Sequence, residues 1–165
     1  MAAEFIYLEN TKPLDIRRTF NWLRNKELRA NFVIARAPLR SEHFMYWRKL
    51  LHDSEQRVFS IFYFSKHVGN CGLKNINIEN RDCEIWIYVA DLSARGRGLA
   101  DCAIEALLAK ARHDLLCTKV YLHVAKNNLA AIRLYRNHNF YVNEKFLEGR
   151  WAGRDADILY MEKEL

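Results

Sequence analysis

The chain has 165 residues, a formal net charge of +6 and half of its residues in the hydrophobic set. This length supports one hydrophobic core and is too short for two ordinary domains, so we expect a single domain over residues 1–165. No apolar run is long enough to cross a bilayer, and the N-terminal stretch around Glu4 lacks the basic and apolar blocks of a secretory signal peptide. The predicted location is the cytoplasm, with no membrane partner.

The charge pattern and the cysteines argue against further classes. Basic residues are scattered among acidic ones, without a run of five or more like charges, so no nucleic-acid partner is indicated. A positive chain can also bind an acidic protein or a small anionic substrate. Cys71, Cys83, Cys102 and Cys117 contain no C-x-x-C pair, which favours free thiols in a reducing compartment over a disulfide framework or a metal site.

The first half of the chain predicts strands and two helices. After a first strand, Asp15 can cap a helix, and Ser41-Glu42 opens a second helix beyond Pro38. Two strands then form a hairpin whose tip includes Gly69-Asn70, and a third strand completes an antiparallel set. The predicted strands of the whole chain are 5–8, 57–64, 71–78, 84–89, 119–124, about 142–150 and about 155–162.

The second half begins with a glycine-rich loop between the strand 84–89 and a helix. Apolar residues recur at helical spacing after Leu99, and the strand 119–124 follows that helix. Because a helix connects the strands 84–89 and 119–124, we expect them to run parallel. Asn127-Asn128 caps the next helix, and two final strands are joined across Gly153.

The glycine-rich loop, Arg95 to Ala100, predicts an anion site. Glycines let backbone N–H groups converge without Cβ atoms in the way, and the helix start adds unpaired donors and a partial positive charge. The natural guest is a phosphate, although a glycine pair before a helix often makes only a tight turn. The spacing is neither G-x-G-x-x-G nor G-x-x-x-x-G-K-[ST], so the two common nucleotide fingerprints are absent.

Two segments resemble the GNAT superfamily of acetyl-CoA-dependent N-acetyltransferases. Arg95 to Ala100 fits its R/Q-x-x-G-x-G/A signature, and Asn128 to Phe140 is similar to its N-x-x-A-I-x-L-Y-x-x-x-G-F segment. Asn139 replaces the usual glycine, and asparagine tolerates the left-handed conformation. The resemblance implies an α/β (α+β) GNAT-like fold. Its mixed central sheet would have about six to seven strands, antiparallel in the N-terminal half, with a splayed parallel pair and about four flanking helices.

The same resemblance implies acetyl-CoA as the cofactor and no metal. The loop would bind the pyrophosphate, Arg97 would also meet a phosphate with its side chain, and Asn128 would steady the CoA arm besides capping its helix. An N–H around Tyr88 or Val89 would polarise the thioester carbonyl. The predicted cofactor-binding residues are Tyr88, Val89, Arg95, Gly96, Arg97, Gly98, Leu99, Ala100 and Asn128.

Two catalytic residues are predicted. Tyr135 matches the family tyrosine that protonates the CoA sulfur, the alternative being a core aromatic. An amine is protonated at neutral pH, so a base is also needed, and carboxylates near Glu84 serve some family members in that role. Asp82, His123 or a water could act instead of Glu84, although a lone histidine in a strand is usually structural.

The acceptor is predicted to be a primary amine. The segments Trp22–Arg29, Glu42–Leu51 and Gly149–Tyr160 are similar to a branch with ribosomal-protein N-terminal acetyltransferases and amino-sugar-nucleotide N-acetyltransferases, such as those of pseudaminic acid synthesis. Aromatic and basic residues before the hairpin favour a nucleotide-linked amino sugar, with a protein N-terminus as the alternative. A polyamine stays open, although the basic charge argues against it. A non-catalytic CoA-binding module and a nucleic-acid-binding domain are alternatives from other classes, and a homodimer is a further expectation.

Overall fold

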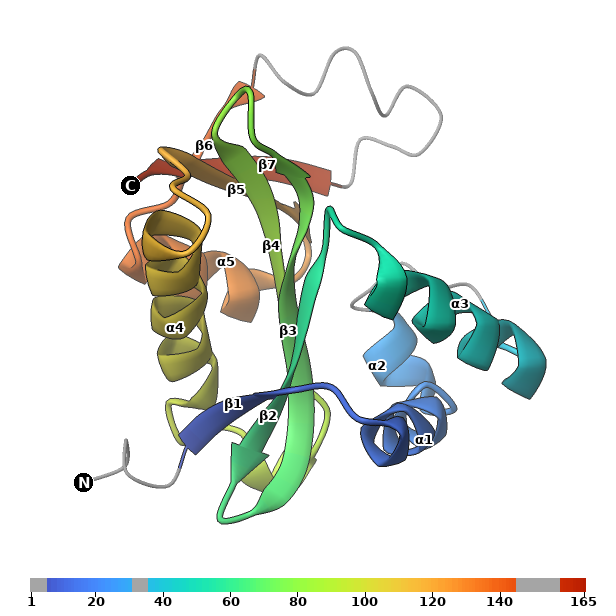
Figure 1. The fold of residues 1–165 in the computed structure, drawn as a ribbon. Coiled ribbons are helices and arrows are strands. Elements are labelled where there is room, and N and C mark those ends of the chain that lie inside the picture. The colour runs from blue at the N-terminus through green and yellow to red at the C-terminus, as the bar shows by residue number, and fades with distance from the viewer. Residues whose placement is uncertain (1–5, 31–35, 145–157) are drawn as a thin grey trace.

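A computed structural model describes residues 6–30, 36–144 and 158–165. They form one seven-stranded sheet with helices on both faces (Figure 1). The strands are β1 (Ile6–Asn10), β2 (Arg57–Tyr63), β3 (Lys66–Asn77), β4 (Asp82–Val89), β5 (Lys119–Ala125), β6 (Tyr141–Val142) and β7 (Ile158–Glu164). The helices are α1 (Pro13–Trp22), α2 (Lys26–Ala30), α3 (Arg40–His52), α4 (Leu99–His113) and α5 (Leu129–Asn137), with a 3₁₀ turn, η2 (Leu92–Ala94).

The mixed sheet expected from the resemblance is confirmed. The strand order is β1-β2-β3-β4-β5-β7-β6, and β1 to β4 pair antiparallel. β4 and β5 run parallel, as the intervening helix requires, and β7 pairs antiparallel with β5 and β6. The β4–β5 register ends at Glu84↔Tyr121, after three residue pairs. Beyond that point the two strands separate, which leaves a gap between their C-terminal halves.

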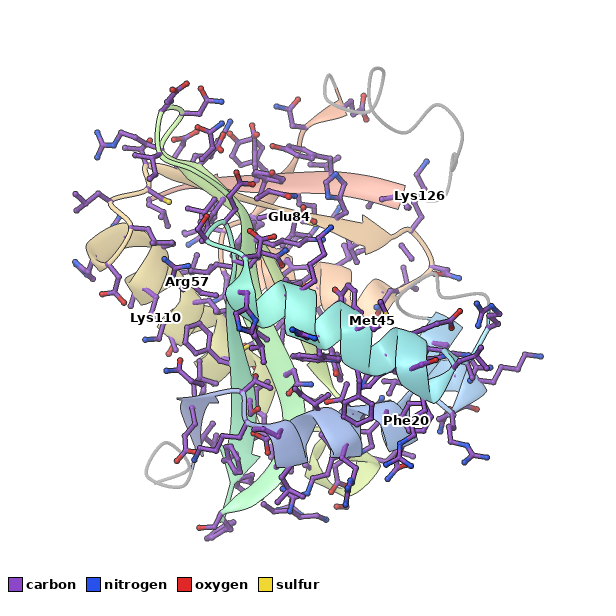
Figure 2. All side chains as sticks on the ribbon, turned by 45° about the vertical axis from the view of Figure 1, so that its right-hand side comes forward. Phe20, Met45, Arg57, Glu84, Lys110 and Lys126 are labelled. Atoms are coloured by element: carbon purple, nitrogen blue, oxygen red, sulfur yellow. The ribbon has the colours of Figure 1, made fainter. Side chains whose placement is uncertain are left out.

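The two faces of the sheet carry different layers (Figure 1). α4 and α5 cover one face, and α1, α2 and α3 lie on the other. Figure 2 shows Lys110 on α4 and Met45 on α3, on opposite sides of the strands. The larger core lies under α4, where Ile104 and Leu107 are completely buried against strand residues such as Ile85 and Leu122. Each such side chain contributes about 1.5–3 kcal/mol by leaving water.

The prediction that Asp15 caps the first helix is wrong. Lys12 is the N-cap and Pro13 the first helical residue, because proline has the φ angle of a first turn and needs no hydrogen-bond partner there. Asp15 lies two residues further on and is buried. Its carboxylate accepts hydrogen bonds from the Lys12 N–H at 2.9 Å and from the Ser60 hydroxyl at 3.0 Å.

The predicted hairpin tip at Gly69-Asn70 is also wrong. β2 and β3 are joined at Phe64 and Ser65, whose φ angles are +46° and +61°, as a two-residue hairpin loop requires. Gly69 and Asn70 therefore lie inside β3. A Cβ atom at Gly69 would overlap the carbonyl oxygen of Tyr88 on β4, so this glycine permits a close approach of two strands.

Two further local predictions, for Asn139 and for the cysteines, are confirmed. Asn139 adopts a left-handed conformation with a φ of +63°. All four cysteines are free, and only Cys102 is more than slightly exposed. β6 shares only Val142 with the predicted strand 142–150, of which residues 145–150 lie outside the described residues together with Gly153. Within the described ranges, no helix is both long and apolar enough to cross a membrane.

Candidate active site

The glycine-rich loop presents backbone donors at the start of α4. Gly96 and Gly98 have φ angles of +71° and +74°, and Gly98 is the N-cap of the helix. A Cβ at either glycine would meet nothing within 4 Å, so glycine is needed for the backbone conformation and not for space. The Cys102 N–H bonds to the Gly98 carbonyl at 3.1 Å, whereas the amides of 96–101 donate to no acceptor in the described residues. The loop is therefore suited to an anion.

The side chains of this loop point to different roles. Leu99 is 2% exposed and packs in the core, so only its main chain can face a ligand. The Arg97 Nε donates to the Ser93 carbonyl at 3.2 Å, and its guanidinium lies 5.8 Å from the centre of the Tyr63 ring. Arg95 Nε donates to the Val89 carbonyl at 3.3 Å, and Arg95 lines an adjacent cleft.

A cleft of about 530 Å³ occupies the gap between β4 and β5. Arg95 and Ala100 contribute to its wall beside the loop, and Glu84 and His123 belong to its lining as well. The sequence-predicted residues Tyr88, Val89, Asn128 and Tyr135 also line it. Of the predicted loop residues, Gly96, Arg97, Gly98 and Leu99 lie outside its lining.

The hydrogen bonding of β4 distinguishes the N–H groups of Tyr88 and Val89, the two donors predicted for the thioester carbonyl. The Ala90 N–H donates to the Val68 carbonyl on β3 at 2.9 Å. Because successive amides of a strand point in opposite directions, the Tyr88 N–H also faces β3, and the Val89 N–H faces the gap. The geometry thus favours Val89 as the donor into the cleft.

Two predicted residues on or beside α5 face the same cleft. Tyr135 is 6% exposed and packs against Phe140 with ring centres 5.8 Å apart. Burial raises the pKa of Tyr135, so its hydroxyl stays protonated at neutral pH. Asn128 caps α5, its side-chain oxygen accepting from the Ala131 N–H at 3.2 Å, as the sequence predicts.

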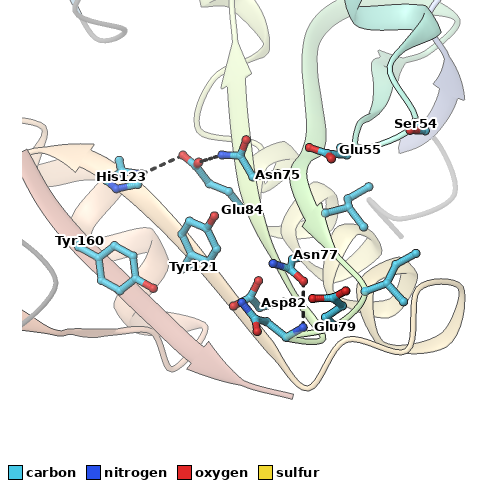
Figure 3. A pocket seen from close by; sticks show the side chains of 13 residues that line it. Ser54, Glu55, Asn75, Asn77, Glu79, Asp82, Glu84, Tyr121, His123 and Tyr160 are labelled. Carbon is cyan, nitrogen blue, oxygen red and sulfur yellow. Dashed lines mark hydrogen bonds and ion pairs between the residues drawn. The ribbon is translucent and has the colours of Figure 1, made fainter. Parts of the chain in front are cut away.

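A second cavity, of about 950 Å³, adjoins the cleft (Figure 3). Its described lining includes four acidic residues and no lysine or arginine. The rings of Tyr121 and Tyr160 are stacked in its wall, with centres 5.4 Å apart. The four acidic residues are Glu55, Glu79, Asp82 and Glu84.

This acidic cavity lies on the α1–α3 side of the sheet. Ile85, Val120 and Leu122 pack in the core under α4, so their neighbours Glu84 and Tyr121 face the other way. Glu55, Glu79 and both tyrosines were not predicted from the sequence. The only signal that could have found the tyrosines is their alternation with core residues along β5 and β7.

Glu84 and His123 line both cavities and therefore mark where they meet. Glu84 is 5% exposed. One of its oxygens lies 2.9 Å from His123 Nδ1, and the other accepts from the Asn75 amide at 2.8 Å (Figure 3). The first oxygen also lies 3.1 Å from Lys74 Nζ. Burial alone would raise the pKa of Glu84, but the His123 hydrogen bond and the Lys74 charge outweigh it, and the pKa is lowered.

The other predicted bases differ in position. Asp82 lines the acidic cavity but not the cleft, whereas His123 reaches both. No group of three or more histidine, cysteine, aspartate or glutamate side chains in the described ranges could hold a metal ion.

Comparisons with known proteins agree with this arrangement. Residues 17–140 match the family model described as "Acetyltransferase (GNAT) family". A spermidine N(1)-acetyltransferase of Vibrio cholerae is 32% identical over 121 residues, which cover 70% of this chain and 68% of that protein. The crystal structure of the Vibrio cholerae spermidine N-acetyltransferase with CoA and spermine superposes with a TM-score of 0.84 at 25% identity, covering 98% of this chain and 96% of that one. The acetyltransferase PseH of Campylobacter jejuni is 21% identical over 131 residues, or 79% of this chain and 80% of that protein.

Proposed function

The chain belongs to the acetyltransferase (GNAT) family, whose enzymes move an acetyl group from acetyl-CoA to an amine, and we propose that its acceptor is an aliphatic polyamine. The amine would attack directly while both substrates are bound. The observation that carries the proposal is the acidic, tyrosine-walled cavity that meets the cleft at Glu84 and His123. Sequence analysis favoured a nucleotide-linked amino sugar, and this acceptor is the alternative to be tested.

The residues present fit acetyl-CoA. The amides of 96–101 would hold the pyrophosphate at the start of α4, and the cleft between β4 and β5 would take the pantetheine arm beside Asn128. The bound coenzyme would supply the acetyl group as an activated thioester. In the transfer, the acyl carbon forms a C–N bond with the amine and its C–S bond to the coenzyme breaks. Val89 would donate its N–H to the carbonyl oxygen, and Tyr135 would hold the proton that the sulfur needs.

Direct attack is supported by the meeting of the two cavities. A substrate in each would bring the amine and the acyl group together at Glu84 and His123, which converts the encounter into an intramolecular step. No cysteine occurs among the described residues that line either cavity, so nothing there offers a thiol to carry the acetyl group. A ternary complex needs no such carrier.

The charge and walls of the acidic cavity support a polyamine. Glu55, Glu79 and Asp82 would attract the distal ammonium groups of a polyamine, and the faces of Tyr121 and Tyr160 suit a cation. The similarity to a spermidine N(1)-acetyltransferase points in the same direction.

Two of the arginines that precede the hairpin are engaged elsewhere. Arg29 donates to the carbonyls of Leu23 and Arg24 at 2.8 and 2.9 Å, at the end of α1. Arg36 forms a two-pronged ion pair with Glu42, with N–O distances of 2.9 and 2.7 Å. These contacts weaken the case for a nucleotide-linked acceptor.

A panel of amines tests the proposal. The protein is incubated with acetyl-CoA and spermidine, spermine, putrescine, a nucleotide-linked amino sugar or a peptide with a free N-terminus, while thiol release and product mass are followed. We expect the highest kcat/KM with a polyamine. A higher value with the amino sugar or the peptide would reject the polyamine, and coenzyme binding without thiol release would indicate a non-catalytic module.

The assembly is a separate expectation. A homodimer remains a prediction, which light scattering on the purified chain would test.

A further inference from the structure

Resting on the proposed acetyl transfer, we propose that His123, and not Glu84, removes the proton from the acceptor ammonium. In this assignment Glu84 is a positioning residue. Its carboxylate orients the His123 ring and stabilises the positive charge that the ring acquires with the proton. The two side chains are joined by the 2.9 Å contact between His123 Nδ1 and a Glu84 carboxylate oxygen, at the boundary of the two cavities.

The contacts of Glu84 make it a poor proton acceptor. Both of its oxygens receive donors from the chain, and two of the three donors come from Lys74 and Asn75 on β3. Protonating this carboxylate would cost the contacts with Lys74 and His123, and the lowered pKa of Glu84 agrees with a committed anion. An acceptor ammonium would have to displace existing partners to give its proton to Glu84.

The same contact fixes the tautomer of His123. An ionised carboxylate only accepts hydrogen bonds, so the Nδ1 that faces Glu84 must carry the hydrogen. The lone pair of the neutral ring then resides on Nε2. His123 lines the acidic cavity as well as the cleft, so its ring lies where the amine must arrive. Imidazole exchanges protons near neutral pH, which suits a general base.

Charged and aromatic groups of the described residues lie around His123. Glu84 on β4 provides the nearest negative charge, partly offset by Lys74, and Asp82 lies in the same cavity wall. The aromatic rings of Tyr121 and Tyr160 lie at 6.1 and 5.5 Å from the ring centre of His123. From the α5 side, the cleft lining contributes the uncharged Asn128 and Tyr135.

The proton steps balance. One N–H bond of the ammonium breaks as the Nε2–H bond of His123 forms, and the electron pair left on nitrogen makes the new C–N bond. His123 then returns its proton to water. The second proton lost by the nitrogen on forming the amide replaces the one that Tyr135 gives to the sulfur.

Two substitutions separate the roles. His123→Asn keeps an N–H donor for Glu84 but removes the base, so we expect kcat to fall about 10²–10⁴-fold and the acidic limb of the pH–kcat/KM profile to disappear. Glu84→Gln keeps an oxygen acceptor but removes the charge that stabilises the imidazolium. We expect a smaller loss and an acidic limb moved to lower pH, because losing the anion disfavours protonation of the ring. The reverse pattern, with the limb lost in Glu84→Gln and kept in His123→Asn, would overturn the proposal.

The chain provides a matched control. His138, the C-cap of α5, contacts Asp101 at 3.1 Å, a similar ring–carboxylate pair that lines neither cavity. We expect His138→Asn to leave the pH profile unchanged. Coenzyme affinity measured by calorimetry should stay within about twofold of the wild type for all three variants.

Nitrogen-15 NMR of the histidine rings gives a readout that does not depend on turnover. In the wild type without substrates, we expect His123 to carry its hydrogen on Nδ1. A hydrogen on Nε2 in the neutral ring would overturn the proposal even if the enzyme is active. If no amine of the panel is acetylated, the proposed function fails, and this spectrum still decides whether the ring is arranged as inferred.

Discussion

The two proposed binding sites are built in different ways on the two faces of the sheet. On the α4–α5 face the core is apolar, and the predicted anion site consists of main-chain amides from one short run, residues 96–101. On the α1–α3 face a polar network is buried, in which Asn70 links His67, Thr19 and Tyr88 through hydrogen bonds of 2.6–2.7 Å. The acidic cavity on that side takes its walls from four separate segments.

This difference shows that a short stretch of sequence can encode the coenzyme half of a two-substrate site, but not the acceptor half. Backbone donors need only the right φ angles and a helix start, which neighbouring residues specify. Side chains that converge from distant strands need the whole sheet to be in register. The coenzyme side can therefore be altered one residue at a time, whereas the acceptor side responds to charge and packing over a wide area.

The largest effect is expected at Tyr135, the side chain on the coenzyme side that is proposed to act as the acid. Tyr135→Phe keeps the ring that packs on Phe140 and removes the proton donor. We expect kcat to fall about 10²–10³-fold with unchanged coenzyme affinity, by steady-state kinetics and calorimetry. Tyr63→Phe, on β2, is the matched control. An unchanged kcat in Tyr135→Phe would remove the residue from its proposed role.

A smaller effect is expected at Gly98, where the coenzyme side depends on backbone conformation. Gly98→Ala places a Cβ on a residue with a φ of +74°, which costs about 1–2 kcal/mol. If the loop turns to relieve that strain, the dissociation constant for acetyl-CoA rises about tenfold, while the KM for the amine is unaffected. Gly98→Asn should recover part of the affinity because asparagine tolerates this conformation. Equal affinities for all three proteins would contradict main-chain binding.

The acceptor side should respond to single charges more weakly. Glu79→Gln removes one carboxylate of the acidic cavity, and we expect the KM for spermidine to rise a few-fold at low salt and less at high salt. A monoamine analogue, which lacks the distal ammonium groups, should show no change. Glu105→Gln on the exposed face of α4 removes the same charge far from the cavity and serves as the control. Similar effects from both variants would point to net charge, and not to the cavity.

The smallest effect concerns how the α1–α3 layer is held. Burial lowers the pKa of His67 and of His43, despite the raising influence of their hydrogen-bond partners. The unfolded chain therefore binds more protons, and stability present above about pH 6.5 is lost as the pH falls through the lower folded-state pKa values. We expect the free energy of unfolding in urea to drop by about 1 kcal/mol or more from pH 7.5 to pH 5.5.

His67→Gln should reduce that slope without abolishing it, because His43 contributes with the same sign. Hydrogen exchange should increase first in α1, which contacts the network through Thr19, and later in α4. A pH-independent free energy of unfolding, or earlier exchange in α4, would contradict this interpretation.

The sequence alone determined the features that depend on neighbouring residues. The loop at Gly96 and Gly98, the Asn128 cap and the left-handed Asn139 all follow from the backbone preferences of single residues. The parallel pairing of β4 and β5 follows from the helix between them. The placement of Tyr135 in the cleft follows from the resemblance carried by its segment.

Which residues form the proposed acceptor site was determined only by the tertiary structure. Glu84 has hydrogen-bond partners on β3 and β5. The buried carboxylate of Asp15 accepts a hydrogen bond from Ser60 on β2, and Gly69 lies inside β3, where β4 approaches closely. A net charge of +6 is a sum over the whole chain and carries no information about one cavity. Its acidic character arises because the fold brings four carboxylates together and keeps the described lysines and arginines out of its lining.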